Sequence, residues 1–155
     1  DPVGRPGTSE TFAATCPFSP TARNEDQLAL ARLLAAPHHD ARLGRYEAKG
    51  LTIVAMEHRA IDAAQADAHY AEHVEQPWYP PLREFAVSGP LVSLVLEGDE
   101  AIAVVRLLNG KTDGRVADPG TIRGDLSLSN RENLVHASDS EESAAREIGL
   151  WFPQL

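Results

Sequence analysis

The chain has 155 residues, of which 43% are hydrophobic and 24% are charged, and these values fit one globular domain with an apolar core. The net charge of −9 argues against nonspecific binding to nucleic acid, whose phosphates would repel it, although a local basic cluster could still bind a small phosphorylated ligand. The single cysteine, Cys16, excludes an intramolecular disulfide and fits a reducing, cytoplasmic location, and no apolar run approaches the roughly 20 residues that cross a membrane.

The first part of the chain combines turn-forming segments with one leucine-rich stretch. Residues 1–10 are rich in glycine and proline, so we expect a flexible lead before a single domain at 11–155. Residues 11–15 are a weak strand candidate. Residues 25–36 carry leucines at roughly helical spacing and predict a helix, and the next segment, 37–44, predicts a break or a short turn.

The middle of the chain alternates between strand and helix patterns. Residues 51–59 are β-branched and apolar after the turn residue Gly50, and they predict a strand. Asp62 is placed to cap a helix that ends before Pro77, and proline in the first turn starts a short helix at 80–87. A buried strand and an amphipathic helix are predicted next, at 91–98 and 99–110.

The last third of the chain opens with a long polar segment. Residues 110–132 have no apolar period, and loops of this length are usually functional or disordered. A short strand at 133–136 and an amphipathic helix at 140–150 follow. The order β-α-β-α-α-β-α-loop-β-α is typical of the α+β, ferredoxin-like split βαβ plan. We therefore expect a four-stranded antiparallel sheet with helices on one face.

His136 stands where the last strand ends and the last helix begins. Ser138 with Glu141, or Asp139 with Glu142, fits a helix-capping pattern, so the helix N-terminus would lie close to the imidazole. Such a terminus favours phosphate and disfavours a charged histidine, so a neutral His136 could act as a nucleophile. The alternative is a strand-end histidine that only satisfies a hydrogen bond.

Other side chains could form a phosphate and base site around this histidine. Arg123 lies between turn residues of the polar segment, and it could bind phosphate or hold its own loop through Asp125 or backbone carbonyls. Arg106 and Thr112 could add a cation and a hydroxyl to the same anion, although Arg106 could equally be a solvated helix residue. The aromatic and apolar side chains near the proline-interrupted helices could form a stacking slot or pack normally; they are Tyr70, Trp78 and Leu82.

The remaining histidines show no metal-binding pattern. His69 and His73 have the i, i+4 spacing that can chelate zinc, but the intervening residues do not match H-E-x-x-H and no third ligand is evident. No protein-bound metal is therefore predicted.

Several motifs together resemble nucleoside diphosphate kinases. They are "HYAEH", "SGP", "LEG", "PGTIRGD" and "NLVHASDSEESAAREIGLWF", in the order and at the spacing of that family, from about residue 46 to residue 152. The resemblance implies a ping-pong transfer, in which the histidine takes the γ-phosphate of a nucleoside triphosphate and passes it to a nucleoside diphosphate. Mg²⁺ would arrive with the nucleotide, and the family's hexamers or tetramers imply a homo-oligomer.

The resemblance also implies a role for each matching residue. His136 matches the phosphate-accepting histidine, and Tyr70, Ser138 and Glu147 match residues that support it. Other residues match family positions that contact the nucleotide. Arg106, Thr112 and Arg123 match residues that contact the phosphates. Trp78 matches the aromatic residue that stacks on the base, Leu82 matches its apolar neighbour, and Asn133 matches the asparagine that contacts the sugar and phosphate side.

The N-terminal part departs from the family pattern. The family's first strand ends in K-P-D, whose lysine binds the transferring phosphate, and the nearest counterpart here is "CPF", with Cys16 in place of the lysine. Segment 16–45 is divergent and does not resemble the family's first helix. Arg23, Arg32 or His38 could replace the lost charge.

This departure leaves several functions open. The first is a working nucleoside diphosphate kinase. The second is a repurposed relative, which would act as a phosphohydrolase or a pathway-specific phosphotransferase. The third is a nucleotide-binding homologue without catalysis.

Overall fold

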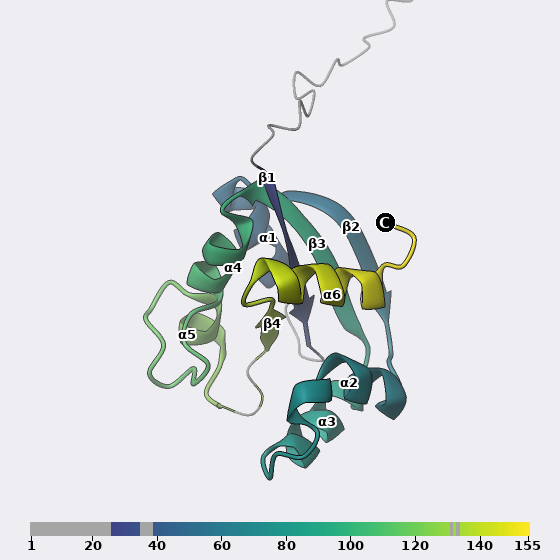
Figure 1. The fold of residues 1–155 in the computed structure, drawn as a ribbon. Helices are drawn as coiled ribbons and strands as arrows, with labels where there is room; N and C mark the ends of the chain where they lie inside the picture. The colour runs from purple at the N-terminus through teal and green to yellow at the C-terminus, as the bar shows by residue number, and fades with distance from the viewer. Residues whose placement is uncertain (1–25, 35–38, 131, 133) are drawn as a thin grey trace, which may run out of the picture.

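The fold is an antiparallel sheet with helices on both faces, as seen in a computed structural model that describes residues 26–34, 39–130, 132 and 134–155 (Figure 1). The four-stranded sheet has the order β2-β3-β1-β4. Its strands are β1 (Asp26–Leu33), β2 (Thr52–Arg59), β3 (Leu91–Asp99) and β4 (Val135–Ala137). The helices are α1 (His39–Lys49), α2 (Ala63–His69), the 3₁₀ turn η1 (Ala71–His73), α3 (Tyr79–Val87), α4 (Ala101–Asn109), α5 (Ile122–Leu126) and α6 (Glu141–Trp151). This confirms the predicted α+β, ferredoxin-like class.

Each face of the sheet carries its own apolar core, so the expectation that helices cover one face is wrong. On one face, Leu33 and Leu94 pack with Tyr46 of α1 and Val105 of α4. On the other face, the strands pack against α2, α3 and the end of α6, through residues that include Leu30, Val95, Ala66, Ala86 and Trp151. Figure 1 shows α6 in front of the sheet and α1 behind it.

The leucine-rich stretch predicted as a helix at 25–36 is strand β1, which corrects the prediction. Alternate residues of β1 enter opposite cores: Ala29, Ala31 and Leu33 face one, and Leu30 faces the other. Because both faces are buried, apolar residues follow one another from Leu28 to Ala31 and again after Arg32, and periodicity cannot distinguish such a pattern from a helix. The strand candidate at 11–15 lies outside the described residues.

The position of β1 also bears on the comparison of the N-terminal part with the family's first strand. Strand β1, which pairs with β3 and β4 in the sheet, ends at Leu33 and is the first strand among the described residues, so the placement of Cys16 at a strand end stays a prediction. Cys16 itself lies outside the described residues. Helix α1 begins at His39, so the described part of the segment predicted as a break or short turn at 37–44 is helical, and a helix follows β1.

Most later elements confirm the predictions. Strands β2 and β3 match the predicted ranges within a residue or two, and the Asp62 side chain caps α2 by accepting from the Gln65 N–H at 2.8 Å. The predicted helix from Asp62 toward Pro77 divides at Tyr70 into α2 and η1. Strand β4 begins two residues later than expected, at Val135.

The polar segment after α4 is held by specific bonds and contains the short helix α5. The Thr121 side chain caps α5 by accepting from the Gly124 N–H at 3.0 Å. The Arg45 guanidinium of α1 donates to the Gly120 carbonyl and to the Asp125 carboxylate, both at 2.7 Å. These contacts fix the segment against the helix layer, close to the end of β4.

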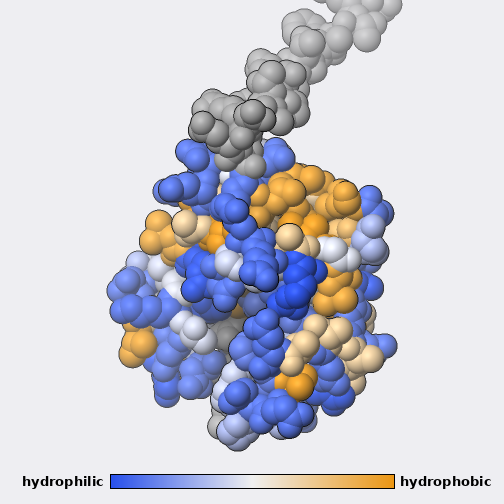
Figure 2. Space-filling view, in the orientation of Figure 1, coloured by the Kyte–Doolittle hydropathy of each residue, from blue (hydrophilic) through white to orange (hydrophobic). Residues whose placement is uncertain are grey.

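The surface is mixed. In the view of Figure 2, hydrophilic residues cover α6, and hydrophobic ones gather beside it over β2 and β3. Among the described residues, no helix combines the length and the apolar character that crossing a membrane would require.

Gly124 offers a test of how tightly the polar segment is packed. A Cβ at this position would lie 2.1 Å from the Asp118 carbonyl oxygen, which is backbone and cannot swing away. We expect Gly124→Ala to lower the free energy of unfolding by about 1–3 kcal/mol. At Gly149, within α6, a Cβ meets nothing within 4 Å, so the control Gly149→Ala should raise it by about 0.5–1 kcal/mol. Urea titration measures both, and an equally stable Gly124→Ala would contradict the described packing.

Candidate functional site

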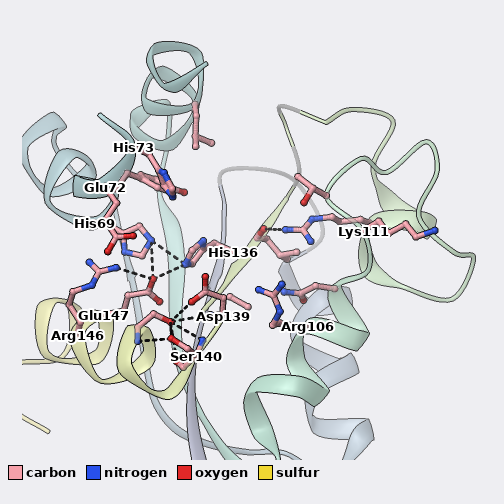
Figure 3. Close-up of a pocket in the computed structure, with 18 of the residues that line it drawn as sticks. His69, Glu72, His73, Arg106, Lys111, His136, Asp139, Ser140, Arg146 and Glu147 are labelled. Carbon is pink, nitrogen blue, oxygen red and sulfur yellow. Dashed lines mark hydrogen bonds and ion pairs between the residues drawn. The ribbon is translucent and has the colours of Figure 1, made fainter. Parts of the chain in front are cut away.

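A cavity of about 630 Å³ opens between α2, α3, the start of α6 and the polar segment. Its size suits a small-molecule ligand. Figure 3 shows His136 at its centre, with His69, Arg146 and Glu147 on one side and Arg106 and Lys111 on the other. The cavity thus gathers residues that lie far apart in the sequence around one imidazole.

The backbone before His136 is held in an unusual conformation. Leu134 has a φ of 66°, in the left-handed region that non-glycine residues seldom adopt. Its carbonyl accepts hydrogen bonds from the Leu34 N–H and from the Arg42 guanidinium, each at 2.8 Å. Strand β4 then pairs with β1, so that His136 lies opposite Arg32. These bonds set the position from which the imidazole enters the cavity.

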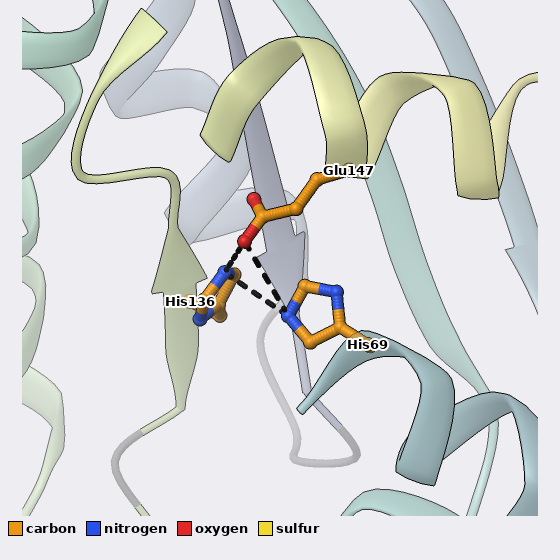
Figure 4. Close-up of side chains that lie close together, drawn as sticks. All are labelled: His69, His136 and Glu147. Carbon is orange, nitrogen blue, oxygen red and sulfur yellow. Dashed lines mark hydrogen bonds and ion pairs between the residues drawn. The ribbon is translucent and has the colours of Figure 1, made fainter. Parts of the chain in front are cut away.

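The Glu147 carboxylate joins His136 to the last helix (Figure 4). Its Oε1 lies 3.2 Å from His136 Nε2 and 3.8 Å from His69 Nε2. Its Oε2 accepts a hydrogen bond from the Ser138 hydroxyl at 2.6 Å. Glu147 and Ser138 are both buried, so the carboxylate depends on these donors.

The Trp151 indole determines which nitrogen of His69 carries the proton. Its Nε1–H, which can only donate, lies 3.1 Å from His69 Nδ1. Nδ1 is therefore the acceptor and Nε2 carries the hydrogen, on the side of Glu147 Oε1, which lies 3.8 Å away. Burial, followed by the charge of Arg32, lowers the pKa of His69 far below its usual range, so His69 is uncharged at neutral pH.

The same geometry argues against a metal ion among these side chains. His69, His136 and Glu147 bring their ligand atoms within 4.8 Å of one another, which is the spacing of a metal site. A metal at His69 Nε2 would need the lone pair that the proton occupies, and Nδ1 would then have to face the Trp151 N–H without accepting from it. The His73 ring lies against Trp78, with 5.1 Å between the ring centroids.

His136 is consequently an uncharged imidazole with one nitrogen engaged and one available. The carboxylate beside Nε2 favours a proton on that atom. Nδ1 lies on the other side of the ring, and it makes no hydrogen bond to the described residues. Burial, and then the charge of Arg32, lowers the pKa of His136 despite the opposing effect of Glu147. Burial alone would raise the pKa of Glu147, but the bonds from His136 and Ser138 outweigh it and lower that pKa.

Arginines and a hydroxyl line the opposite wall. Arg106 is exposed and has no hydrogen bond or ion pair to any residue that the structure describes, so its donors are available. Arg123 donates to the carbonyls of Gly110 at 2.7 Å and Val135 at 2.6 Å, so it holds its loop while it lines the cavity. Asp125, the other partner considered from the sequence, binds Arg45 instead. Thr112 lines the same wall.

The mouth of the cavity carries an exposed aromatic ring. Half of the Trp78 surface, 50%, is exposed, which is unusual for an indole, and Leu82 lies beside it on the same lining. Tyr70 lies deeper and is buried, with its hydroxyl accepting from the Arg32 guanidinium at 2.8 Å. A flat ring entering the cavity would meet Trp78 first.

The structure corrects the predicted helix cap and leaves one site residue untested. Ser140 caps α6 by accepting from the Ser143 N–H at 3.1 Å, and Ser143 returns a bond to the Ser140 N–H. The caps proposed at Ser138 and Asp139 are wrong; Ser138 turns inward to Glu147 instead. Asn133 lies outside the described residues.

Sequence reasoning missed several side chains that the cavity brings together. His69 precedes Tyr70 directly in the motif "HYAEH", but only the folded chain shows that it faces His136 at 3.2 Å. Lys111 and Arg146 add cations to the lining. The spacing of His69 with His73 suggested only a zinc ligand, and no periodicity or spacing signal marks Lys111 and Arg146.

Comparisons with known proteins agree on one family. A family model described as nucleoside diphosphate kinase matches residues 34–155. A nucleoside diphosphate kinase of Nocardioides sp. is 75% identical over 115 residues, which are 74% of this chain and 85% of the relative. One from Cutibacterium acnes is 62% identical over 113 residues, 73% of this chain and 82% of the relative. A halophilic nucleoside diphosphate kinase from Halobacterium salinarum, solved in complex with CDP, has a TM-score of 0.79 at 38% identity and covers 82% of this chain and 88% of its own.

The neutral state of His69 predicts a pH dependence of stability. The unfolded chain takes up a proton at this histidine below about pH 6.5, whereas the folded chain does not. Its contribution to stability is therefore complete above pH 6.5 and is lost as the pH falls, by about 1.4 kcal/mol for each pH unit. We expect the free energy of unfolding of His69→Gln to fall less steeply between pH 6.5 and pH 5 than that of the wild type. Equal slopes in urea titrations at one protein concentration would contradict a buried, uncharged His69.

Proposed function

The chain belongs to the nucleoside diphosphate kinase family, and we propose that His136 is the residue that carries the phosphate from one nucleotide to the next. The activity is phosphotransfer between nucleoside triphosphates and nucleoside diphosphates. One observation carries the proposal: an uncharged imidazole has Nε2 held by Glu147, while Nδ1 is left available in a cavity walled by arginines. The repurposed and non-catalytic alternatives have no comparable observation in their favour.

In the first half-reaction, the Nδ1 lone pair attacks the γ-phosphorus of a nucleoside triphosphate. The bond from phosphorus to the bridging oxygen breaks, and the nucleoside diphosphate leaves with the electron pair. The ring gains positive character as the new N–P bond forms, and Glu147 stabilises it through the Nε2–H. Attack by a second nucleoside diphosphate reverses these steps, so no proton is gained or lost over the cycle.

The arginine wall would hold the phosphates during transfer. Arg106 has free donors, Arg123 adds a cation fixed by its carbonyl contacts, and Thr112 adds a hydroxyl. Phosphoryl transfer needs positioning and charge neutralisation above all, and these residues supply both around one nucleophile.

The base of the nucleotide would stack on Trp78 at the mouth of the cavity. The indole is half exposed with Leu82 beside it, and stacking of this kind tolerates different bases because each has a flat face. The contact that the resemblance gives to Asn133, on the sugar and phosphate side, remains a prediction.

Mg²⁺ would enter with the nucleotide. Among the described residues the one group with metal-ligand spacing is His69, His136 and Glu147, which is richer in nitrogen than Mg²⁺ prefers. The protein thus offers no oxygen cage of its own in the described part of the chain. The nucleotide phosphates and water would hold the ion, which would neutralise charge on the transferring group.

A homo-oligomer in the cytoplasm completes the proposal. Strand β2 is an edge of the sheet, and its Val54 and Met56 side chains are 43% and 59% exposed. An unpaired edge with apolar side chains favours burial against a second copy of the chain. The number of subunits, six or four, follows from the family resemblance alone.

Replacement of His136 tests the proposed function directly. Wild type mixed with γ-phosphate-labelled ATP is expected to acquire an acid-labile label and to release it to an added nucleoside diphosphate. His136→Gln should do neither, because no nucleophile remains. The control Arg115→Gln, at a residue outside the cavity lining, should behave as wild type. An unlabelled wild type, or transfer by His136→Gln, would overturn the proposal.

The free guanidinium of Arg106 allows a matched comparison. We expect Arg106→Gln to lower kcat/KM for nucleoside triphosphate by about 10²-fold or more, the effect of losing one charged contact to the reacting group. Arg115 is also exposed, but it is bound to Asp113 at 2.7 Å and lies outside the cavity lining, so Arg115→Gln should stay within about twofold of wild type. Similar losses in both variants would show a general charge effect instead of a contact.

A further inference from the structure

Arg32 is a completely buried arginine beside the nucleophile. It lies on β1 directly opposite His136 in the register of β1 with β4, and none of its surface is exposed. Burial of a guanidinium is costly unless its donors are satisfied. Arg42, which is also buried, donates to the carbonyls of Leu34 and Leu134. Arg32 differs from Arg42 in its hydrogen bonds.

The guanidinium of Arg32 is only partly satisfied. Its Nη2 donates to the Tyr70 hydroxyl at 2.8 Å. Its Nε and Nη1 are buried and have no hydrogen-bond partner among the residues that the structure describes. The cation packs over the rings of Tyr70 and Trp151, at 5.2 Å and 4.9 Å from their centroids. The charge thus stands within the aromatic wall of the site without a carboxylate partner of its own.

Building on the proposed function, we infer that Arg32 is a positioning residue for the phosphate acceptor. It turns the Tyr70 hydroxyl toward the cavity, and it places a fixed positive charge behind the His136 imidazole. Neither effect requires Arg32 to touch the nucleotide, which agrees with its complete burial and with its absence from the cavity lining.

The Tyr70 hydroxyl has one proton, and its bond to Arg32 leaves that proton available. Since the oxygen accepts from Arg32, the O–H is free to donate elsewhere. The hydroxyl makes no hydrogen bond to an acceptor in the described part of the chain, and Tyr70 lines the cavity beside His136. An oxygen of a phosphate on Nδ1 would be the acceptor that this arrangement lacks.

The charge of Arg32 acts on His136 together with the other groups that face it. These are Glu147 from α6, Arg123 from α5, and the uncharged His69 with Tyr70 at the end of α2. After burial, Arg32 is the largest influence lowering the pKa of His136, and Glu147 opposes it. Loss of the Arg32 charge should raise that pKa, so that more of the imidazole is protonated and unable to attack as the pH falls.

NMR titration of isotope-labelled histidine in the unphosphorylated protein tests the charge effect without any turnover. We expect His136 of Arg32→Gln to titrate at a higher pH than in wild type, and Arg32→Lys to restore the lower midpoint. The control is Arg59→Gln, because Arg59 packs on the same Trp151 ring at 5.4 Å but does not pair with β4. A midpoint in Arg32→Gln equal to that of Arg59→Gln would overturn the inference.

Single-turnover phosphorylation tests the link to Tyr70. Arg32→Lys and Tyr70→Phe should each lower the rate by about 10- to 100-fold, and the double variant should lose little more than either. Additive losses would overturn the link. If Arg32→Gln does not fold, these two variants still test the link between Arg32 and Tyr70, since Arg32→Lys keeps the positive charge. An unphosphorylated wild type would refute the proposed function, while the titration would still report on Arg32.

Discussion

The buried carboxylate of Glu147 is the contact on which the rest of the site depends. It accepts from Ser138 at 2.6 Å and lies 3.2 Å from His136 Nε2, so it connects the last helix to strand β4 and the turn after it. A buried carboxylate stays ionised only when such donors surround it. His69, held by the Trp151 indole, directs a third donor, its Nε2–H, toward the same carboxylate from 3.8 Å. Trp151 therefore connects the apolar core on this face of the sheet to the polar site.

This arrangement divides the cavity between two tasks. On the side of α6, the network of Glu147, His69 and Ser138 fixes the orientation of His136, while burial and the charge of Arg32 keep its imidazole uncharged. On the opposite side, Arg106 and Arg123 offer positive charge to a phosphate. The chain as a whole carries a net charge of −9, so the cationic wall is a local feature that the overall charge conceals. A weakly basic nucleophile and a strong local field are together what phosphoryl transfer requires.

The sequence predicted the later part of the molecule better than the beginning. Turn and cap residues such as Asp62 and Gly110 mark element ends by local chemistry, and those boundaries agree with the structure. Strand β1 was misread because both of its faces are buried, so its apolar residues lack the alternation that identifies a strand.

The residues of the candidate site were also predicted only in part from the sequence. The specific motif around His136 pointed to the nucleophile and to Glu147, and the structure places both together. Arg32 and His69 could not be singled out, because their importance lies in strand register and in the direction of one indole N–H. These are properties of the folded chain. The helix cap was misplaced by one or two residues since several serines and acidic residues follow one another, and local pattern alone does not choose among them.

The position of the phosphate on His136 tests the account most directly. The network holds Nε2 and leaves Nδ1 in the cavity, so NMR of the phosphorylated wild type should show phosphate on Nδ1, with Nε2 still protonated and coupled to Glu147. Phosphate on Nε2 would mean that the Glu147 contact breaks during the reaction. It would contradict the claim that this carboxylate holds Nε2 and so makes Nδ1 the nucleophilic atom.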